Sequence, residues 1–420
     1  MKKDSNTERV SKHVLDNGTR VLVDEIPHLN TVAVGLCCVG GSRDETPETN
    51  GVSHLLEHLL FKRTSNLSVR DIAEQIDELG GEINACTDPD SLLIHGVVPE
   101  DRADALLELL ASLIADAQFT EDDLEVEKEI IRQEILDSDD HAGDATYRHF
   151  RKQFWKDTTL GSPVAGTKES VEGLGFKDVT KRLKTLRCGA RTVLSVAGRI
   201  SAKHVQDFAQ RSFGAFPPGH ALNNTRVSTL RGSLLLPRQA NQTYLVYGFP
   251  WPGIAHEDFL AAILLSSLLG QGNSSALFQR LREEEGLSYD IDAGLESYAD
   301  TSAFTVSASF ERENLDRVLE LLFSELERVV VEGISERAVS RHRNMLTAQL
   351  ELEWDSVVGR MNRILETEMM LGRYVHPSEI RKRLEALTVD QLRAFAAKHL
   401  RREDSLLVLG GDIDKTHVKG

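Results

Sequence analysis

The sequence predicts an α+β protein built from two homologous units in tandem, and three observations lead to this fold class. First, two short apolar strands each follow a basic helix and have a glycine just before their last residue. They are Arg191–Arg199 and Asp404–Asp412. Second, two amphipathic helices, Arg102–Leu113 and Asn314–Leu326, are each followed by a further charged helix, and their offset along the chain nearly equals that of the two strands. Third, alternating segments such as Ala303–Phe310 are typical of half-buried antiparallel strands. A pattern that recurs over half the length of a chain indicates internal duplication.

The elements of the two predicted units follow the same order. The first unit begins with strands at His13–Asp24 and Thr31–Gly40, and the second begins with a strand at Asn241–Gly248. Helices, a hairpin-like pair of strands, more helices and a closing strand come next. Thr120 and Ser335, which are separated by nearly the same offset as the two strands, are matched N-cap candidates of the charged helices.

The predicted boundaries are a first unit over residues 1–215, a linker over 216–239 and a second unit over 240–420. Each unit is expected to hold an antiparallel-rich β-sheet flanked by helices. The linker is predicted from residues that favour turns, namely Pro217, Pro218, Gly219, Asn223 and Asn224.

Composition places the chain among globular proteins. Of 420 residues, 40% are hydrophobic and 27% are charged, which excludes collagenous, low-complexity and mostly disordered classes. Apolar runs such as Leu260–Leu269 are far shorter than the ~20 residues that a membrane-spanning helix needs. We therefore expect no membrane span.

The first residues and the cysteines predict a cytoplasmic location. Met1–Asp16 contains no apolar run of the kind that a secretory signal carries. The cysteines are too few and too irregularly spaced for a disulfide framework, which favours buried reduced thiols. They are Cys37, Cys38, Cys86 and Cys188.

Charge is distributed unevenly along the chain, whose net charge is −17. Residues 51–150 hold 7 basic and 24 acidic side chains, whereas residues 151–250 hold 16 basic and 5 acidic ones. An acidic region beside a basic one argues against a nucleic-acid-binding protein, which would carry one dominant basic face. It is compatible with a divalent-metal site or a basic peptide ligand, although solvated helix faces account for most of these charges.

The segment Gly51–Lys62 carries the strongest chemical signal. His54 and His58 lie four residues apart, so a helix would project both imidazoles from one face, as two ligands of one zinc ion require. Glu57 flanks that face in the order H-x-x-E-H, the inverse of the commoner zinc-protease motif, and can take a proton from water. A surface helix without metal is the alternative. The leucines around the motif predict a buried helix, in which unpartnered polar side chains would be costly.

A catalytic zinc site needs a third protein ligand and an open position. The predicted helix Thr120–Asp137 offers two candidates, Glu127 and Glu134. Because they are seven residues apart, both carboxylates lie on the same helix face, two turns from one another.

These segments resemble the pitrilysin/insulinase family of zinc peptidases, and in particular its short branch of mitochondrial-processing-peptidase-like and bacterial proteins. The likeness rests on the histidine motif, on the position of Glu134 downstream of His58, and on ELGGEINACTDPD, EVEKEIIRQEI and LGSPVAGTKESV in family order. It covers nearly the whole chain and implies a processing-peptidase-like fold with two homologous halves. It also implies one Zn²⁺ per chain, with His54, His58 and Glu134 as ligands. Glu57 would be the catalytic base, and Glu127 would orient a ligand histidine.

The resemblance further implies a substrate site on the strand around Gly81–Thr87. There Asn84 and Ala85 would hydrogen-bond the backbone of an extended peptide, which is recognition of main chain rather than of sequence. The chain departs from the family where Arg63-Thr64 replaces the usual Gly-Thr. It departs again at residues 92 and 94, where Leu and Ile replace a frequent Thr and Tyr.

The second half has no zinc motif. Its matched helix, Ala262–Gly272, is apolar or small, and Gln349 corresponds to Glu134, so one zinc site per chain is expected. The resemblance instead assigns Arg282 and Tyr289, seven residues apart, to completing an active site, where they would donate hydrogen bonds to the developing oxyanion. A buried tyrosine and an ion-paired arginine are the structural alternative.

In the short branch of the family, a two-unit chain is half of a clamshell, and the arginine and tyrosine face the zinc site of a partner chain. This chain carries both sets of residues. The resemblance therefore implies a homodimer, or pairing with a homologous subunit, that acts on a peptide substrate.

The sequence thus predicts a zinc-dependent endopeptidase that hydrolyses peptides or unfolded protein segments, with the water at the metal activated by Glu57. One alternative is a non-catalytic assembly or binding subunit, like the respiratory-complex core proteins that resemble this family. Another is a different metal hydrolase or a metal-binding module. A glutamate between the two histidines favours hydrolysis over metal storage.

Overall fold

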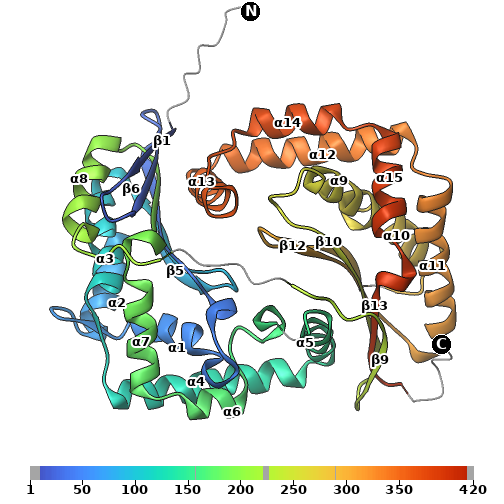
Figure 1. Ribbon diagram of the computed structural model, residues 1–420, viewed down its shortest axis with the longest axis horizontal. Coiled ribbons are helices and arrows are strands. Elements are labelled where there is room, and N and C mark those ends of the chain that lie inside the picture. Colours follow the sequence, from blue (N-terminus) through green and yellow to red (C-terminus); the bar gives the residue numbers. More distant parts are fainter. Residues whose placement is uncertain (1–9, 157, 221–226, 289, 414–420) are drawn as a thin grey trace, which may run out of the picture. The chain divides into compact units, whose positions relative to one another are not determined.

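The computed structural model describes residues 10–156, 158–220, 227–288 and 290–413, which form two compact units (Figure 1). Neither unit is continuous in sequence. Unit 1 comprises Met1–Ile135, Ser162–Asn223 and Leu352–Tyr374. Unit 2 comprises Leu136–Gly161, Asn224–Glu351 and Val375–Gly420. Each unit is therefore completed by a segment from the other half of the chain.

Unit 1 is built on a six-stranded sheet with the strand order β1-β2-β8-β3-β6-β5. Strands β2 and β8 are parallel, and the other neighbours are antiparallel. The central strands are buried over nearly their whole length, as strands covered on both faces must be. In sheet order the strands are β1 (Val10–Val14), β2 (Arg20–Glu25), β8 (Thr192–Gly198), β3 (Thr31–Val39), β6 (Ser91–Pro99) and β5 (Glu82–Thr87).

Unit 2 is built on a five-stranded sheet with the strand order β11-β12-β10-β13-β9. Starting from β9, this order repeats the order β2-β8-β3-β6-β5 of unit 1, with its one parallel pair at the same place. The repeat confirms the predicted α+β fold with two homologous, antiparallel-rich sheets. The strands are β9 (Gly232–Pro237), β10 (Thr243–Pro252), β11 (Asp290–Ser297), β12 (Thr301–Phe310) and β13 (Leu406–Gly411).

Strand β9 lies inside the segment that the sequence predicted to be a linker. It pairs in parallel with β13, from Gly232 beside Leu406 to Pro237 beside Gly411. The turn-forming residues before it suggested a linker. Its extended conformation depends on a partner strand far along the chain, which local composition does not reveal.

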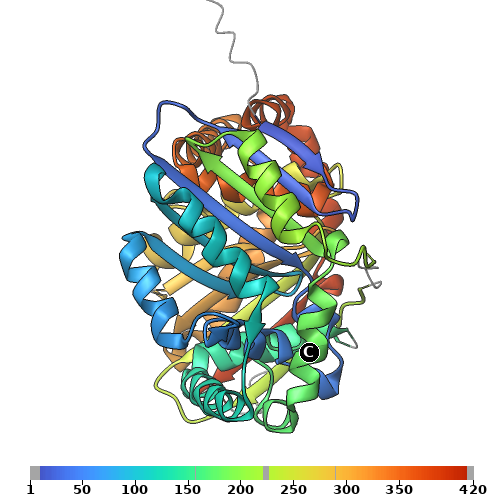
Figure 2. The same cartoon turned by 90° about the vertical axis from the view of Figure 1, so that its left-hand side faces the viewer.

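One face of the first sheet is covered by helices from the first half of the chain. Figure 2 looks onto this face, with α3 and α8 in front of the strands. Leucines of α1 and α3 share one apolar core with alternate residues of the strands. The helices of this half in unit 1 are α1 (Val52–Leu60), α2 (Val69–Leu79), α3 (Ala103–Ala115), α4 (Glu121–Asp140, as far as Ile135), α6 (Lys168–Gly173), α7 (Phe176–Leu186) and α8 (Ala202–Phe213). The short strands β4 (Arg63–Thr64) and β7 (Ala117–Gln118) pair beside them.

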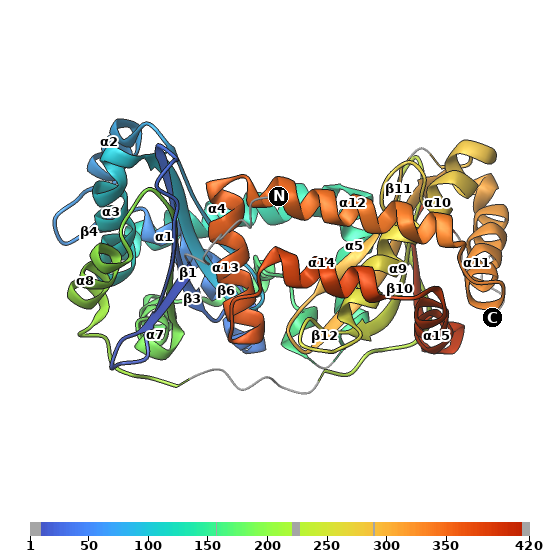
Figure 3. The ribbon, with the colours of Figure 1, turned by 90° about the horizontal axis from the view of Figure 1, so that it is seen from above.

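The opposite face of the first sheet is covered by α13 (Val357–Leu371), which comes from the second half of the chain and lies beside the sheet in Figure 3. Ile364 and Leu365 of this helix pack against apolar residues of the sheet, and Ser195 of β8 donates a hydrogen bond to the carbonyl of Met361 (2.9 Å).

The second sheet shows the reciprocal arrangement. One of its faces is covered by α5 (Ala142–Phe154) from the first half of the chain, through Phe150 and Phe154. The helices that follow its strands in sequence pack on the other face. They are α9 (Phe259–Gly270), α10 (Ala276–Phe278), the π-helix η6 (Gln279–Glu284), α11 (Leu315–Val331), α12 (Glu336–Trp354), α14 (Pro377–Ala386) and α15 (Val389–His399).

Both predicted N-cap residues occupy their positions. The hydroxyl of Thr120 accepts a hydrogen bond from the amide of Asp123 (3.1 Å) at the start of α4. The hydroxyl of Ser335 accepts one from the amide of Ala338 (3.3 Å) at the start of α12. The matched caps confirm that these two helices are counterparts.

Two further predictions concern the whole chain. Within the described residues, no helix is both long enough and apolar enough to cross a membrane. All four cysteines are free thiols, and three of them are buried.

Candidate metal centre

Helix α1 carries the histidine motif at the edge of the first core. Its apolar residues, Leu55, Leu56, Leu59 and Leu60 among them, are buried against the sheet and α7. The three polar residues of the motif are half-buried on the remaining face. The sequence predicted this burial, because leucines at helical spacing leave one polar stripe.

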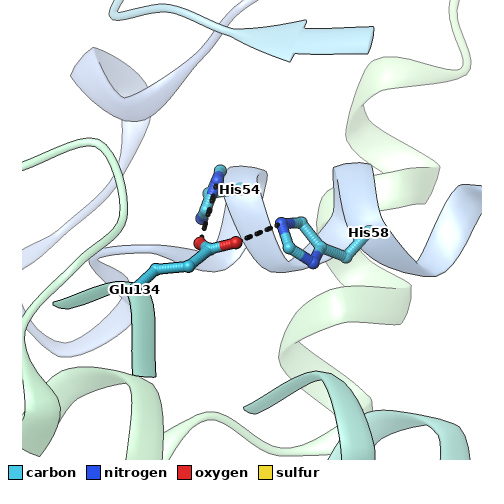
Figure 4. Close-up of side chains that lie close together, drawn as sticks. All are labelled: His54, His58 and Glu134. Atoms are coloured by element: carbon cyan, nitrogen blue, oxygen red, sulfur yellow. Dashed lines mark ion pairs between the residues drawn. The ribbon is translucent and has the colours of Figure 1, made fainter. Parts of the chain in front are cut away.

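The carboxylate of Glu134, from α4, lies between the two imidazoles (Figure 4). One oxygen is 3.9 Å from Nε2 of His54, and the other is 3.8 Å from Nε2 of His58. One ligand atom from each residue falls within 4.8 Å of the others. Ligands at zinc distances in a tetrahedron are about 3.3 Å apart, so small rotamer changes would close these three atoms around an ion.

Burial keeps His54 in the form that binds metals. Desolvation, with a smaller contribution from His58, lowers the pKa of His54 to about 4. Its imidazole is therefore neutral at neutral pH, with a lone pair available on Nε2. Nδ1 is buried and has no hydrogen-bond partner among the residues that the structure describes.

Glu127 contacts the second histidine from two turns further back on α4. Its Oε2 lies 2.8 Å from Nδ1 of His58, and its Oε1 forms an ion pair with Lys62. Glu127 is 3% exposed. A carboxylate on Nδ1 fixes the tautomer that leaves Nε2 free, which is the contact that the predicted orienting role requires.

Glu57 lies beside the ligands with its carboxylate held by a neighbouring strand. The hydroxyl of Thr87, at the end of β5, donates a 2.6 Å hydrogen bond to Oε2 of Glu57. Burial raises the pKa of Glu57, while the Thr87 hydrogen bond and His58 act in the opposite direction. A raised pKa makes a carboxylate a better proton acceptor near neutral pH. Thr87 was not predicted from the sequence as a site residue, although it ends the strand that was predicted to bind substrate.

The strand predicted to bind substrate is at an edge of the sheet. β5 is the last strand in the order and pairs with β6 alone within the described part of unit 1. The side chain of Asn84 is exposed and accepts a hydrogen bond from the amide of Ala85 (2.9 Å). An edge strand with exposed backbone groups is the geometry that main-chain pairing with a peptide needs.

The residues predicted from the second half lie in unit 2. Arg282 is on the π-helix η6, with its guanidinium 4.8 Å from the ring centroid of Phe278. Tyr289 lies outside the described residues. π-helical turns are rare and occur often at functional sites.

The donor set fits zinc. Two imidazole nitrogens and one carboxylate oxygen are a protein ligand set that catalytic zinc sites use. Across the described parts of both units, no second group of three histidine, cysteine or acidic side chains is placed to hold a metal.

Two known family descriptions match successive parts of the chain. The family described as insulinase (peptidase family M16) matches residues 20–168, and the one described as the peptidase M16 inactive domain matches residues 176–346. The first match contains the histidine motif and Glu134, and the second covers most of the homologous half that lacks them.

Similar curated proteins span the length of the chain. An uncharacterized zinc protease of Rickettsia felis is 30% identical over 91% of this chain and 93% of its own length. YmxG of Bacillus subtilis, also named an uncharacterized zinc protease, is 29% identical over 95% of this chain and 98% of its own.

Solved structures show the same fold at low sequence identity. The peptidase M16 inactive domain from Pseudomonas fluorescens superposes with a TM-score of 0.90 at 18% identity, over 96% of this chain and 98% of that one. A protease from Helicobacter pylori gives a TM-score of 0.89 at 19% identity, over 96% and 99%. A chain of complex III from Candida albicans gives 0.84 at 19% identity, over 96% of each chain.

Proposed function

Because this chain belongs to the insulinase (peptidase M16) family, we propose that it is a zinc-dependent endopeptidase that hydrolyses peptides or unfolded protein segments. One observation carries the proposal: the carboxylate of Glu134 lies 3.8–3.9 Å from both histidine Nε2 atoms, beside Glu57. The names of the curated relatives, which are zinc proteases, agree with it.

Each residue of the motif has a role in this proposal. His54 and His58, through Nε2, and Glu134 would hold the ion. Bound zinc would act as a Lewis acid that polarises a carbonyl and makes water a nucleophile near neutral pH. Glu57 then takes the proton of the attacking water and passes it to the leaving amine. Thr87 keeps the Glu57 carboxylate directed at the site.

The substrate would bind as an added strand on β5. Main-chain hydrogen bonds to Asn84 and Ala85 would hold an extended peptide without selecting a sequence. A folded protein has few free extended segments, so this mode favours peptides and unfolded chains.

The experiment that tests the proposal combines metal analysis with a peptidase assay. After zinc loading, we expect about one Zn²⁺ per chain and cleavage of a fluorescence-quenched peptide. A chelator should abolish the cleavage, and added zinc should restore it. Clearly less than half an equivalent of zinc would contradict the metal assignment. One equivalent without cleavage of varied unstructured peptides would favour the non-catalytic binding subunit.

We also propose that the protein pairs, as a homodimer or with a homologous subunit, and that Arg282 and Tyr289 complete the zinc site of the partner. The test mixes Glu57→Gln chains with Arg282→Ala chains, each nearly inactive alone. A shared site gives the heterodimer one site with both defects and one intact site, so activity returns. Sites contained within one chain would recover nothing.

A further inference from the structure

Helix α1 is short for a helix that holds two candidate metal ligands. It has nine residues, and the two candidate ligands stand at its third and seventh positions. Isolated helices of this length are marginal in water. Side chains of a metal site must nevertheless be held to within about 0.5 Å of the productive geometry. Contacts at the two ends of this helix must therefore supply the rigidity that its length does not.

The N-terminal end is capped from outside the helix. Gly51 occupies the N-cap position with a φ of 93°, and an added Cβ would lie 2.8 Å from the carbonyl oxygen of Ala165. No serine, threonine or aspartate fits there, so the usual cap is excluded. Glu45 replaces it: Oε2 accepts from the amide of Gly51 (2.8 Å), and Oε1 accepts from the amide of Ser53 (2.8 Å).

Glu45 is fixed in this position. It is 5% exposed and also accepts a hydrogen bond from the side-chain amide of Asn50 (3.1 Å). The preceding Asp44 is anchored by ion pairs to Arg191 (2.9 Å) and Arg182 (3.4 Å). The buried carboxylate thus holds the turn of α1 that contains His54.

The C-terminal end is held through Glu127. That carboxylate is buried, and it contacts His58 with one oxygen and Lys62 with the other. An imidazole alone leaves a buried negative charge poorly compensated, which is costly. Lys62 supplies the missing positive charge and occupies the oxygen that would otherwise be free to turn away from His58.

We propose that Glu45 and Lys62, which are not metal ligands, are positioning residues that hold His54 and His58 in place from the two ends of α1. The inference rests on the proposed zinc site. These contacts order His54 and His58 before the metal binds. Without Glu45 or Lys62, metal binding would have to supply that ordering itself, so the affinity for metal should be weaker.

The first test measures zinc affinity by competition with a chelator. For Lys62→Met we expect a 10- to 100-fold weaker affinity, the usual cost of losing a group that supports a ligand. Lys62→Arg should restore most of it, because a guanidinium can also pair with Glu127. The matched control is Lys128→Met, which removes an ion pair to Glu125 on α4. Lys62→Met within twofold of wild type, or Lys62→Arg as weak as Lys62→Met, would overturn the role of Lys62.

The second test uses the other end of the helix. Glu45→Ala removes the cap and should weaken zinc binding about 2- to 30-fold, the range that the loss of a helix cap predicts. Glu45→Gln keeps one acceptor and should lie between Glu45→Ala and wild type. Glu48→Gln, at an exposed residue of the same loop, is the control. An unchanged affinity in both Glu45 variants would overturn the role of Glu45.

The readouts separate this inference from the proposed function. Excess zinc should restore part of the kcat that each variant loses, while KM for the peptide stays unchanged. If Glu45→Ala does not fold, Glu45→Gln and the Lys62 pair still decide the outcome. Wild type that binds zinc but cleaves nothing contradicts the peptidase alone. Wild type that binds no zinc removes the site and, with it, this inference.

Discussion

The helix pairs α1/α4 of unit 1 and α9/α12 of unit 2 are counterparts that have different polar contacts. α4 buries Leu124, Glu127 and Ile131. α12 buries Val339, His342 and Leu346, which stand at the corresponding positions of the second unit. In unit 1 the carboxylate of Glu127 joins α4 to the imidazole of His58 on α1. In unit 2 the hydroxyl of Ser267 meets Nδ1 of His342 (3.0 Å), and Gln271 donates to Gln349 (3.3 Å).

The difference shows what the candidate metal site has beyond the shared scaffold. In unit 2 the contacts join neutral groups that satisfy each other, so the helices pack without an ion. In unit 1 the exposed carboxylate of Glu134 lies 3.8–3.9 Å from the Nε2 atoms of two half-buried imidazoles, too far for close hydrogen bonds. Half-buried imidazole nitrogens that lack close hydrogen bonds are costly unless a further group binds them.

The largest effect is expected from removing a ligand. His58→Ala should leave less than about 0.1 equivalent of zinc per chain and no peptidase activity, because two ligands do not retain the ion. Gln271→Ala in unit 2 is the matched control and should keep one equivalent. Full zinc content in His58→Ala, measured by metal analysis after dialysis, would contradict the ligand assignment.

Next in size is the loss of the base. Glu57→Gln should keep the metal but lose several orders of magnitude in kcat, since the water has lost its proton acceptor. Metal analysis and the quenched-peptide assay measure the two quantities separately. Cleavage as fast as in wild type would show that the assigned mechanism is wrong.

A smaller effect is expected at Glu127, whose proposed role is to orient His58. Glu127→Gln should lower zinc affinity or activity by about 10- to 100-fold, because an amide can still accept from Nδ1 but carries no charge. Chelator competition measures the affinity. A loss as large as that in His58→Ala would make Glu127 a ligand rather than an orienting group.

The pH dependence of zinc-free protein should reflect His54. Its pKa falls from 6.5 in the unfolded chain to about 4 in the folded protein. The unfolded chain therefore binds more protons between these values. The contribution to stability is present above pH 6.5 and is lost as the pH falls toward 4, by up to about 3 kcal/mol. Glu57 and Glu45, whose pKa values are raised by burial, act in the opposite sense. Unfolding by denaturant at several pH values should show a flatter dependence in His54→Gln, and an unchanged slope would contradict the assignment.

The smallest effect on the metal is expected in unit 2. His342 is 1% exposed, and His342→Ala leaves the Ser267 hydroxyl without this partner, which costs about 1–3 kcal/mol of stability. Zinc content and peptidase activity should not change at temperatures where the variant is folded. A loss of zinc with intact folding would mean that the two helix pairs are not independent. Thermal unfolding and metal analysis together check both statements.

Much of the candidate site could be read from the sequence because it depends on short-range geometry. His54, Glu57 and His58 share one helix, and their spacing alone places them on one face. Glu127 and Glu134 share another helix in the same way. The duplication was visible because strands and helices recur at nearly constant offsets, and the cap residues Thr120 and Ser335 were predicted correctly for the same reason.

Contacts between residues that are distant in sequence were decided only by the tertiary structure. No local pattern shows that Lys62 pairs with Glu127, that Thr87 holds Glu57, or that Glu45 caps a helix six residues away. Nor does local pattern show that 232–237 pair with β13, or that α5 and α13 each cover the sheet built mainly by the other half of the chain. Helical spacing is a property of a few neighbouring residues, whereas these pairings depend on which buried surfaces fit together once the whole chain has folded.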